Sequence, residues 1–210
     1  MKTDDLIAAL SRGVEPASRT ELVRRAVLAL VAGASLALGL LWLTLGIRED
    51  LLAAAVPVAL KAAFAALATV GAGFAAVHLA RPGGRASSLA AFAAVLVGGL
   101  AVAAISLAGL APGERLGAWL GGGFPSCIVR IPLLSVPVAL LLIRAWREAA
   151  PTRLALAGTA IGALAGGLAA IVYSLYCPID SVAFVATWYG VGIGLSAAVG
   201  ALLGTRLLRW

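Results

Sequence analysis

Six long apolar stretches follow one another along this chain, and the short segments between them carry nearly all of the charged side chains. A helix needs roughly 20 mostly apolar residues to cross bilayer hydrocarbon, and each stretch is close to that length. The pattern therefore predicts membrane-spanning helices at residues 26–47, 52–79, 88–110, 128–146, 153–174 and 182–205.

The composition agrees with an all-α, polytopic integral membrane protein. Of the 210 residues, 62% are hydrophobic and only 12% are charged, whereas a typical soluble domain is about half apolar and about a quarter charged. The apolar positions do not alternate with polar ones, as the strands of an outer-membrane barrel would require. Residues 26–210 are therefore expected to form one domain of six transmembrane helices.

The basic residues predict how the chain is oriented. The first apolar run begins only near Ala26, after a polar stretch, so the first span is expected to be a retained anchor rather than a cleaved signal peptide. Short segments rich in Lys and Arg are usually cytoplasmic, and one side of the predicted spans carries 12 of the 16 basic residues. These are Lys2, Arg12, Arg19, Arg24, Arg25, Arg81, Arg85, Arg144, Arg147, Arg153, Arg206 and Arg209. Both termini are therefore expected in the cytoplasm, and the net charge of +7 reflects topology and lipid contact rather than direct nucleic-acid binding.

Residues 1–25 are the only sizeable segment outside the predicted spans. Thr3 can cap a short helix that has Asp4 and Asp5 in its first turn, where carboxylates favour the positive end of the helix dipole. The apolar face of this helix consists of Leu6, Ile7, Leu10 and Val14. An amphipathic helix of this kind either lies on the lipid surface or docks a protein partner, and both interpretations stay open on these residues alone.

The two cysteines, Cys127 and Cys177, are equally far in the sequence from residue 152. That residue lies in the polar turn between two predicted spans. If these spans are antiparallel helices, both thiols lie at one membrane surface, opposite to the basic segments. That side is oxidising, so a structural disulfide is one interpretation. The other is a pair of exposed thiols that react with oxidants or transiently bind a soft metal ion, and so shift the helices between two packings.

The residues that usually carry catalysis are missing from the sequence. There is no Ser-His-Asp set, no pair of intramembrane carboxylates, no phosphate-binding loop and no His/Cys cluster suited to zinc. Neither an enzyme nor a resident cofactor is therefore expected. No acidic residue lies deep in a predicted span, as a proton-driven transporter would need. A small transporter or channel and a membrane thiol oxidoreductase remain as alternatives.

One charged residue, Lys61, lies well inside a predicted span. A central position would cost about 2.5–3.5 kcal/mol on insertion scales, so Lys61 is expected either to snorkel toward the outer surface or to contact helix-end carbonyls. The connection 177–181 is so short that the last two spans must be adjacent, and Asp180 or Ser181 is expected to cap the last helix.

Small and aromatic residues predict helix packing. Glycines repeat at intervals of four and should let helix backbones approach closely within the molecule; they are Gly158, Gly162 and Gly166 in the fifth span, and Gly190 with Gly194 and Gly200 with Gly204 in the sixth. Tyr173 and Tyr189 fall near predicted membrane surfaces and are interpreted as interfacial anchors. The outer loop 111–127 is the longest, and its glycine-rich composition allows movement.

Several short motifs together resemble a known family. They are Met1-Lys2-Thr3-Asp4-Asp5-Leu6-Ile7, Pro125-Ser126-Cys127, Cys177-Pro178 followed by Phe184 and Trp188-Tyr189-Gly190, and the ending Gly200-Ala201-Leu202-Leu203-Gly204-Thr205-Arg206-Leu207-Leu208-Arg209-Trp210. In these the chain resembles the NrsF family. Its members are six-span inner-membrane anti-sigma factors that hold an extracytoplasmic-function sigma factor of the sigma-F type inactive. The resemblance covers essentially the whole chain.

The resemblance implies that two parts of the chain have different functions. Cytoplasmic residues 1–25 would hold the sigma factor, and residues 26–210 would form a transmembrane sensor domain. The expected contacts with the sigma factor are Asp4, Asp5, Leu6, Ile7 and Leu10. Cys127 and Cys177 would sense heavy-metal or oxidative stress in the periplasm and trigger release. Family members often carry His just before the second cysteine and Glu two residues after it. The Tyr176 and Ile179 found here favour thiol oxidation or a two-thiolate metal contact instead.

Overall fold

The computed structural model describes Thr3 and residues 19–81, 83–121, 125–147, 149 and 151–209. Its helical elements, in chain order, are α2 (Arg19–Thr44), α3 (Ala55–Leu79), η1 (Ala86–Leu89), α4 (Ala90–Ala108), α5 (Pro112–Leu120), α6 (Cys127–Arg147), α7 (Leu154–Tyr173), α8 (Val182–Phe184), η2 (Val185–Tyr189) and α9 (Gly190–Leu207). The expected sigma-factor contacts from Asp4 to Leu10 lie outside the described residues.

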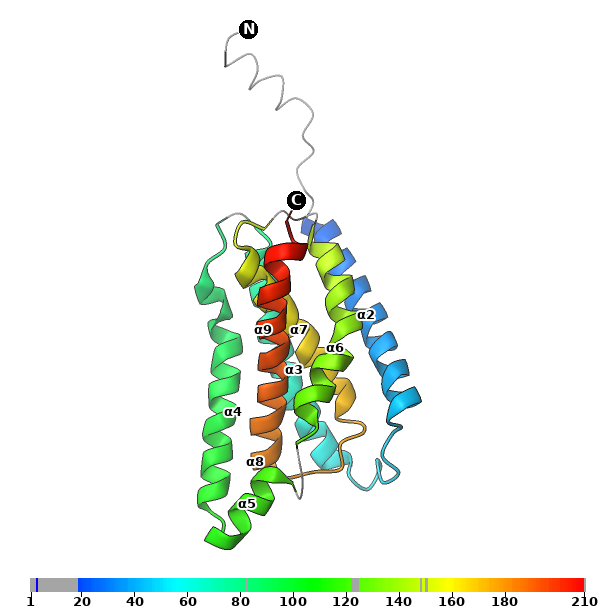
Figure 1. Cartoon of the computed structure of the whole chain (residues 1–210), viewed down its shortest axis with the longest axis vertical. Coiled ribbons are helices and arrows are strands. Elements are labelled where there is room, and N and C mark those ends of the chain that lie inside the picture. The colour runs from blue at the N-terminus through cyan, green and yellow to red at the C-terminus, as the bar shows by residue number, and fades with distance from the viewer. Residues whose placement is uncertain are drawn as a thin grey trace.

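The prediction of six membrane-spanning helices is confirmed. Six helices are long and apolar enough to cross a membrane: Thr20–Thr44, Ala55–Leu79, Ala86–Ala108, Cys127–Arg147, Leu154–Tyr173 and Val182–Leu207. Their ends lie within a few residues of the predicted ones, apart from the first span, which starts earlier. The described part of the chain contains no strand, and Figure 1 shows an elongated, all-α bundle.

Helix α7 forms the centre of the bundle. It packs most extensively against α9 and α3, and it also contacts α6 and α2, whereas α4 lies on the outside, next to α3 and the start of the last span (Figure 1). Most of α7 is buried, while most of α4 is exposed. The sequence explains the central position, because α7 is made largely of Ala and Gly, whose small side chains allow neighbours on every side.

The glycines of α7 and α9 face each other at very short range, as predicted. A Cβ added to Gly158 would lie 2.2 Å from the carbonyl oxygen of Gly200 and 2.9 Å from the Cα of Gly204. We call this contact the glycine seam. The same expectation is wrong for Gly190 and Gly194. A Cβ on Gly194 would meet nothing within 4 Å, and one on Gly190 would touch only side chains.

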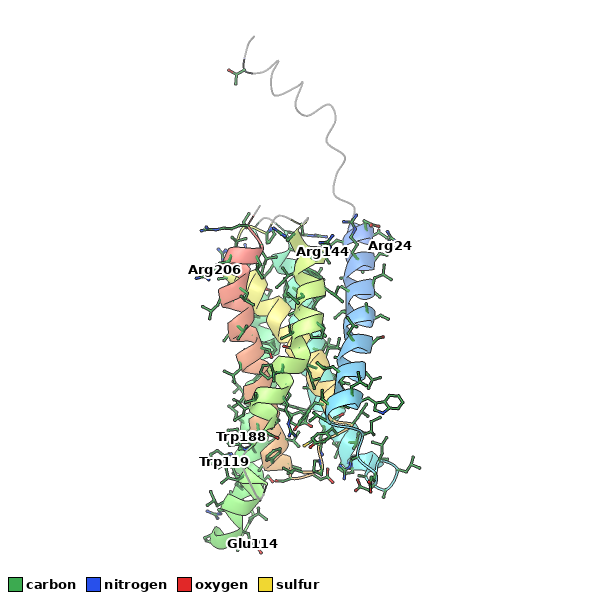
Figure 2. The ribbon with its side chains drawn as sticks, turned by 45° about the vertical axis from the view of Figure 1, so that its right-hand side comes forward. Arg24, Glu114, Trp119, Arg144, Trp188 and Arg206 are labelled. Atoms are coloured by element: carbon green, nitrogen blue, oxygen red, sulfur yellow. The ribbon has the colours of Figure 1, made fainter. Side chains whose placement is uncertain are left out.

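The two ends of the bundle differ in charge. Arg24, Arg144 and Arg206 gather at one end, and Glu114 lies at the other (Figure 2). We call the first the basic end. We call the second the cysteine end, because α6 begins there with Cys127 and α7 ends there shortly before Cys177. The structure therefore agrees with basic residues lying together on one side of the membrane.

The long outer loop, whose composition was expected to allow movement, contains a helix, α5, that the sequence analysis did not predict. Pro112 occupies its first turn, and Gly121 closes it with a left-handed backbone at φ 67°, a conformation that glycine adopts without strain. The helix is fastened to the last span because Trp188 Nε1 donates a hydrogen bond of 2.7 Å to the carbonyl oxygen of Trp119. The two indole rings are tilted against each other with centroids 5.0 Å apart, so α5 is docked on the cysteine end (Figure 2).

Candidate functional site

The two cysteines lie at the same end of the bundle, as their spacing predicted. Cys127 is the first residue of α6, and Cys177 lies in the connection between α7 and α8. The expectation that the thiols are exposed is wrong. Both are free, and their exposed fractions are only 1% and 2%. Both cysteines belong to the hydrophobic core of the bundle, and Cys127 also packs closely against α9, because its carbonyl oxygen would lie 3.2 Å from a Cβ on Gly192.

The two thiols form part of one cluster. They are close enough to interact electrostatically, and both also interact with Tyr173 and Tyr189. All four side chains belong to the hydrophobic core of the bundle. A chemical change at either sulfur therefore alters the packing between α6, α7 and the last span.

Tyr189 is the most unusual neighbour of the thiols. Its ring lies 5.8 Å from that of Tyr173. Within the described part of the chain its hydroxyl group is buried and makes no hydrogen bond. Buried polar groups are nearly always paired, and leaving one unpaired costs about 1–3 kcal/mol. The expectation that these tyrosines anchor the membrane surface is therefore wrong, because both are buried against the cysteines.

A positive charge borders the same cluster. The guanidinium group of Arg130, in the first turn of α6, lies 5.1 Å from the ring centroid of Tyr176, a cation–π distance. Arg130 and Ser126 are also polar neighbours of the Tyr173 side chain. The start of α6 and the end of α7 are thus joined by polar contacts beside the thiols.

Lys61 reaches this region from inside α3. It is buried, with 2% of the side chain exposed, and does not snorkel to the surface. Its ammonium group donates hydrogen bonds to the Cys177 carbonyl oxygen at 2.8 Å and to Asp180 Oδ1 at 2.5 Å. The expected alternative, contact with a carbonyl at a helix end, is the one that the structure contains. Lys61 thereby ties α3 to the backbone of one cysteine.

Arg48, from the connection between α2 and α3, contacts the same two groups. Its Nη1 donates to the Cys177 carbonyl oxygen at 3.2 Å and to Asp180 Oδ1 at 3.0 Å, and its Nε donates to Asp50 Oδ1 at 2.7 Å. Burial raises the pKa of Asp180, but the hydrogen bonds from Arg48 and Lys61 outweigh it, so the pKa lies below its ordinary value. Asp180 is therefore a charged partner for two cations, whereas Ser181 caps α8 by accepting from Phe184 N at 3.4 Å.

The described residues contain no group of three or more His, Cys, Asp or Glu side chains placed to hold a metal ion. Asp180, the nearest carboxylate, is engaged by Lys61 and Arg48. Any metal contact here would therefore rest on the two sulfurs, a soft donor set that suits thiophilic ions.

Sequence reasoning missed several members of this cluster, namely Arg48, Asp180 as an ion-pair partner, Arg130, Tyr173 and Tyr189. One signal was available, because a cation inside a span needs a nearby acidic partner. Asp180 lies in the connection that follows Cys177, on the side of the membrane nearest to Lys61. The burial of the tyrosines depends on how each helix is rotated, which residue spacing alone did not reveal.

Comparison with known proteins gives one consistent family. Residues 10–210 match the family model described as NrsF, negative regulator of sigma F. The "Probable anti-sigma-F factor NrsF" of Azospira oryzae is 39% identical over 213 residues, and the "Anti-sigma-F factor NrsF" of Caulobacter vibrioides is 37% identical over 216 residues. Each alignment covers the full length of both chains. No solved structure matches.

Proposed function

The chain belongs to the NrsF family of negative regulators of sigma F, and from this premise we propose that it is an inner-membrane anti-sigma factor. The observation that carries the proposal is the similarity along the whole length of two proteins named anti-sigma-F factors. In this role the chain holds an extracytoplasmic-function sigma factor of the sigma-F type at the membrane. The sigma factor cannot then direct transcription until it is released.

The sigma factor is held at the basic end of the bundle. Gathering of Arg24, Arg144 and Arg206 at that end supports a cytoplasmic position for it. Residues 1–25, with their charged and apolar positions from Asp4 to Leu10, are then on the side where a sigma factor is found. Residues 19–25 already belong to α2, so a movement of α2 changes the position of the binding segment.

Cys127 and Cys177 receive the signal, which is a heavy-metal ion or an oxidant at the periplasmic surface. Their burial supports a response that requires local opening, because a buried structural cysteine is otherwise inert. The Cys177 carbonyl accepts hydrogen bonds from Lys61 of α3 and from Arg48 just after α2. Displacement of the Cys177 backbone therefore disturbs both helices, and α2 carries the change to the basic end.

Release from isolated membranes tests this function. Membranes with the full chain and its bound sigma factor are treated with a thiophilic metal ion or with peroxide, and the freed sigma factor is measured. The parent is expected to release it. A double variant, Cys127→Ala with Cys177→Ala, is expected to bind the sigma factor normally and keep it under stress. Alanine is used because a buried serine hydroxyl without a partner would itself cost about 1–3 kcal/mol. Equal release from the parent and this variant would contradict sensing by the cysteines.

The binding segment is tested separately. Leu6→Asp with Leu10→Asp removes apolar contact worth about 1.5–3 kcal/mol for each fully buried side chain, so sigma-factor capture should weaken severely and the target genes should be active without stress. Lys2→Gln is the matched control, since it changes the same segment outside the apolar face. Full repression by the double variant at normal protein level would show that this face does not bind the sigma factor.

A further inference from the structure

A groove lies on the outside of the bundle between α3, α4 and the start of the last span. Its volume is about 330 Å³, and its lining includes Pro57, Lys61 and Phe64 of α3 with Gly98 and Gly99 of α4. This volume is at the lower end of the range for small-molecule sites. The anti-sigma role described above makes no use of it.

The groove is elongated and faces the lipid. On α3 its lining residues recur every three or four positions from Pro57 to Leu67, which corresponds to about 15 Å of helix. Leu60, Leu67 and Val102 in its wall are exposed by 50–63% in the isolated bundle. A single hydrocarbon chain lying along α3 therefore enters from the membrane without crossing the protein.

Glycines keep the α4 wall of the groove open. A Cβ added to Gly98 would meet nothing within 4 Å, so the space beside it is empty of protein atoms. A Cβ on Gly99 would lie 2.7 Å from Cε2 of Phe64. The Phe64 ring therefore rests against bare backbone, and the neighbouring Gly98 adds no side chain to fill the groove.

Lys61 and Asp180 are the two charged residues in the lining of the groove. An ammonium group has three N–H donors, and within the described residues Lys61 uses two of them, on the Cys177 carbonyl and on Asp180. The third N–H has no protein acceptor among the described residues, although only 2% of the side chain is exposed. Two cations and two carboxylates, Lys61 and Arg48 with Asp50 and Asp180, balance each other locally. A neutral acceptor therefore suits this position better than an anion.

We propose that the groove binds one membrane amphiphile, whose uncharged carbonyl group accepts a hydrogen bond from Lys61 and whose apolar chain lies between α3 and α4. Two sources supply this chemistry, namely the carbonyl of an isoprenoid quinone and the ester carbonyl of a phospholipid. The head of the ligand contacts the side chain that also holds the Cys177 backbone. Val185 and Ala186 of the π-helical segment η2 line the same groove, and π-helical turns are frequent at functional sites.

Photo-crosslinking of the purified full chain in detergent tests the proposal. The probe is a benzoquinone with a ten-carbon tail that ends in a diazirine, and the labelled peptides are identified by mass spectrometry. Saturable labelling of α3 and α4 near Leu67 and Val95 is expected. The competitors are decylubiquinone, phosphatidylcholine, and decylbenzene, which has the tail but no carbonyl. A quinone source predicts displacement by decylubiquinone, and a lipid source predicts displacement by phosphatidylcholine.

Three variants decide the outcome. Gly98→Leu adds a side chain to the groove wall at a position where a Cβ meets nothing within 4 Å, and should abolish the labelling there, whereas Gly39→Leu, equally free of Cβ contacts but on α2, should leave it unchanged. Lys61→Met should weaken competition by the effective carbonyl ligand about tenfold or more, the usual effect of losing a charge-assisted hydrogen bond, and should not change competition by decylbenzene. Equal labelling of Gly98→Leu and the parent, or decylbenzene competing as well as both carbonyl compounds, would overturn the proposal even if Lys61→Met failed to fold.

Discussion

The α7–α9 pair packs differently at its two ends. Toward the basic end the helices meet at the glycine seam, where a Cβ on Gly200 would lie 2.3 Å from the carbonyl oxygen of Gly158. Toward the cysteine end, α7 stops at Tyr173, and the π-helical η2 precedes α9. Large side chains separate the helices there, with the Tyr173 and Tyr189 rings 5.8 Å apart.

This difference indicates which end can rearrange. Glycine has no side chain that could change rotamer, so the backbone contact at the glycine seam allows few other packings. The cysteine end depends on tyrosines, two free thiols and an ion-pair cluster, all of which can adopt new contacts. A signal at the thiols is therefore expected to move the helices about the glycine seam, which stays fixed.

The largest effect is expected from breaking the glycine seam. Gly200→Ala places a methyl group 2.3 Å from the Gly158 carbonyl oxygen and 2.8 Å from the Cα of Gly162. Backbone atoms cannot rotate away, so we expect destabilisation of about 3 kcal/mol, the upper part of the usual range for overpacking. The measurement is the folded fraction in detergent, followed by gel filtration after heating.

Gly194→Ala is the matched control for this change. It lies on the same helix, and its Cβ would meet nothing within 4 Å. Alanine also favours a helix over glycine by about 1 kcal/mol. The control should therefore be as stable as the parent or slightly more stable. Similar loss of folded protein in both variants would show that the seam is not what holds α7 to α9.

The second effect concerns the ion-pair cluster at the cysteine end. Asp180→Asn leaves the buried ammonium group of Lys61 without its carboxylate. Breaking a fully buried pair costs about 3–5 kcal/mol, but Asp180 is 36% exposed, so solvent screening reduces the expected loss to about 2 kcal/mol. Asp50→Asn is the control, because within the described residues Asp50 pairs with Arg48 and not with Lys61, and it is 59% exposed. Its effect should be too small to resolve.

The same residue predicts a dependence on pH. The pKa of Asp180 is lowered in the folded protein by Arg48 and Lys61, despite burial. Its stabilisation is therefore complete above the ordinary aspartate pKa of about 4 and is lost as the pH falls through the lower folded value. The parent should approach Asp180→Asn in stability below about pH 4, and the two should differ most near pH 7. A constant difference across this range would exclude Asp180 as the titrating group.

The sequence predicted the six helices because the thickness of the bilayer fixes how long an apolar span must be. It also placed Cys127 and Cys177 at one end of the bundle. The two spans that meet near residue 152 are antiparallel, so residues equally far from that turn lie at the same depth in the membrane. Gly158 and Gly200 were identified as packing positions because only a bare backbone allows so close an approach. These features depend on local composition and on the connectivity of neighbouring spans.

The burial of the thiols could not be predicted in the same way. It depends on how α6, α7 and the last span pack together, which also buries Tyr189 of η2. Of the two residues expected to cap the last helix, Ser181 does so, whereas the Asp180 carboxylate is bound by Lys61 and Arg48. Contacts among helix α3, the α2–α3 connection and the α7–α8 connection decide these assignments, and no local pattern encodes them.

The smallest effect on stability is expected from Tyr189→Phe. Within the described residues the Tyr189 hydroxyl has no hydrogen-bond partner, so its removal should leave the free energy of unfolding unchanged or raise it by up to about 1 kcal/mol. Tyr173→Phe is the matched control, because the Tyr173 hydroxyl has Ser126 and Arg130 as polar neighbours, so its loss should cost up to about 1 kcal/mol. An unpaired hydroxyl beside Cys177 can donate to that sulfur once it carries charge or oxygen. We therefore expect Tyr189→Phe to require a higher metal or peroxide concentration for sigma-factor release, although its resting stability is unimpaired. A destabilised Tyr189→Phe with an unchanged release threshold would instead show that the hydroxyl supports the resting bundle and takes no part in the response.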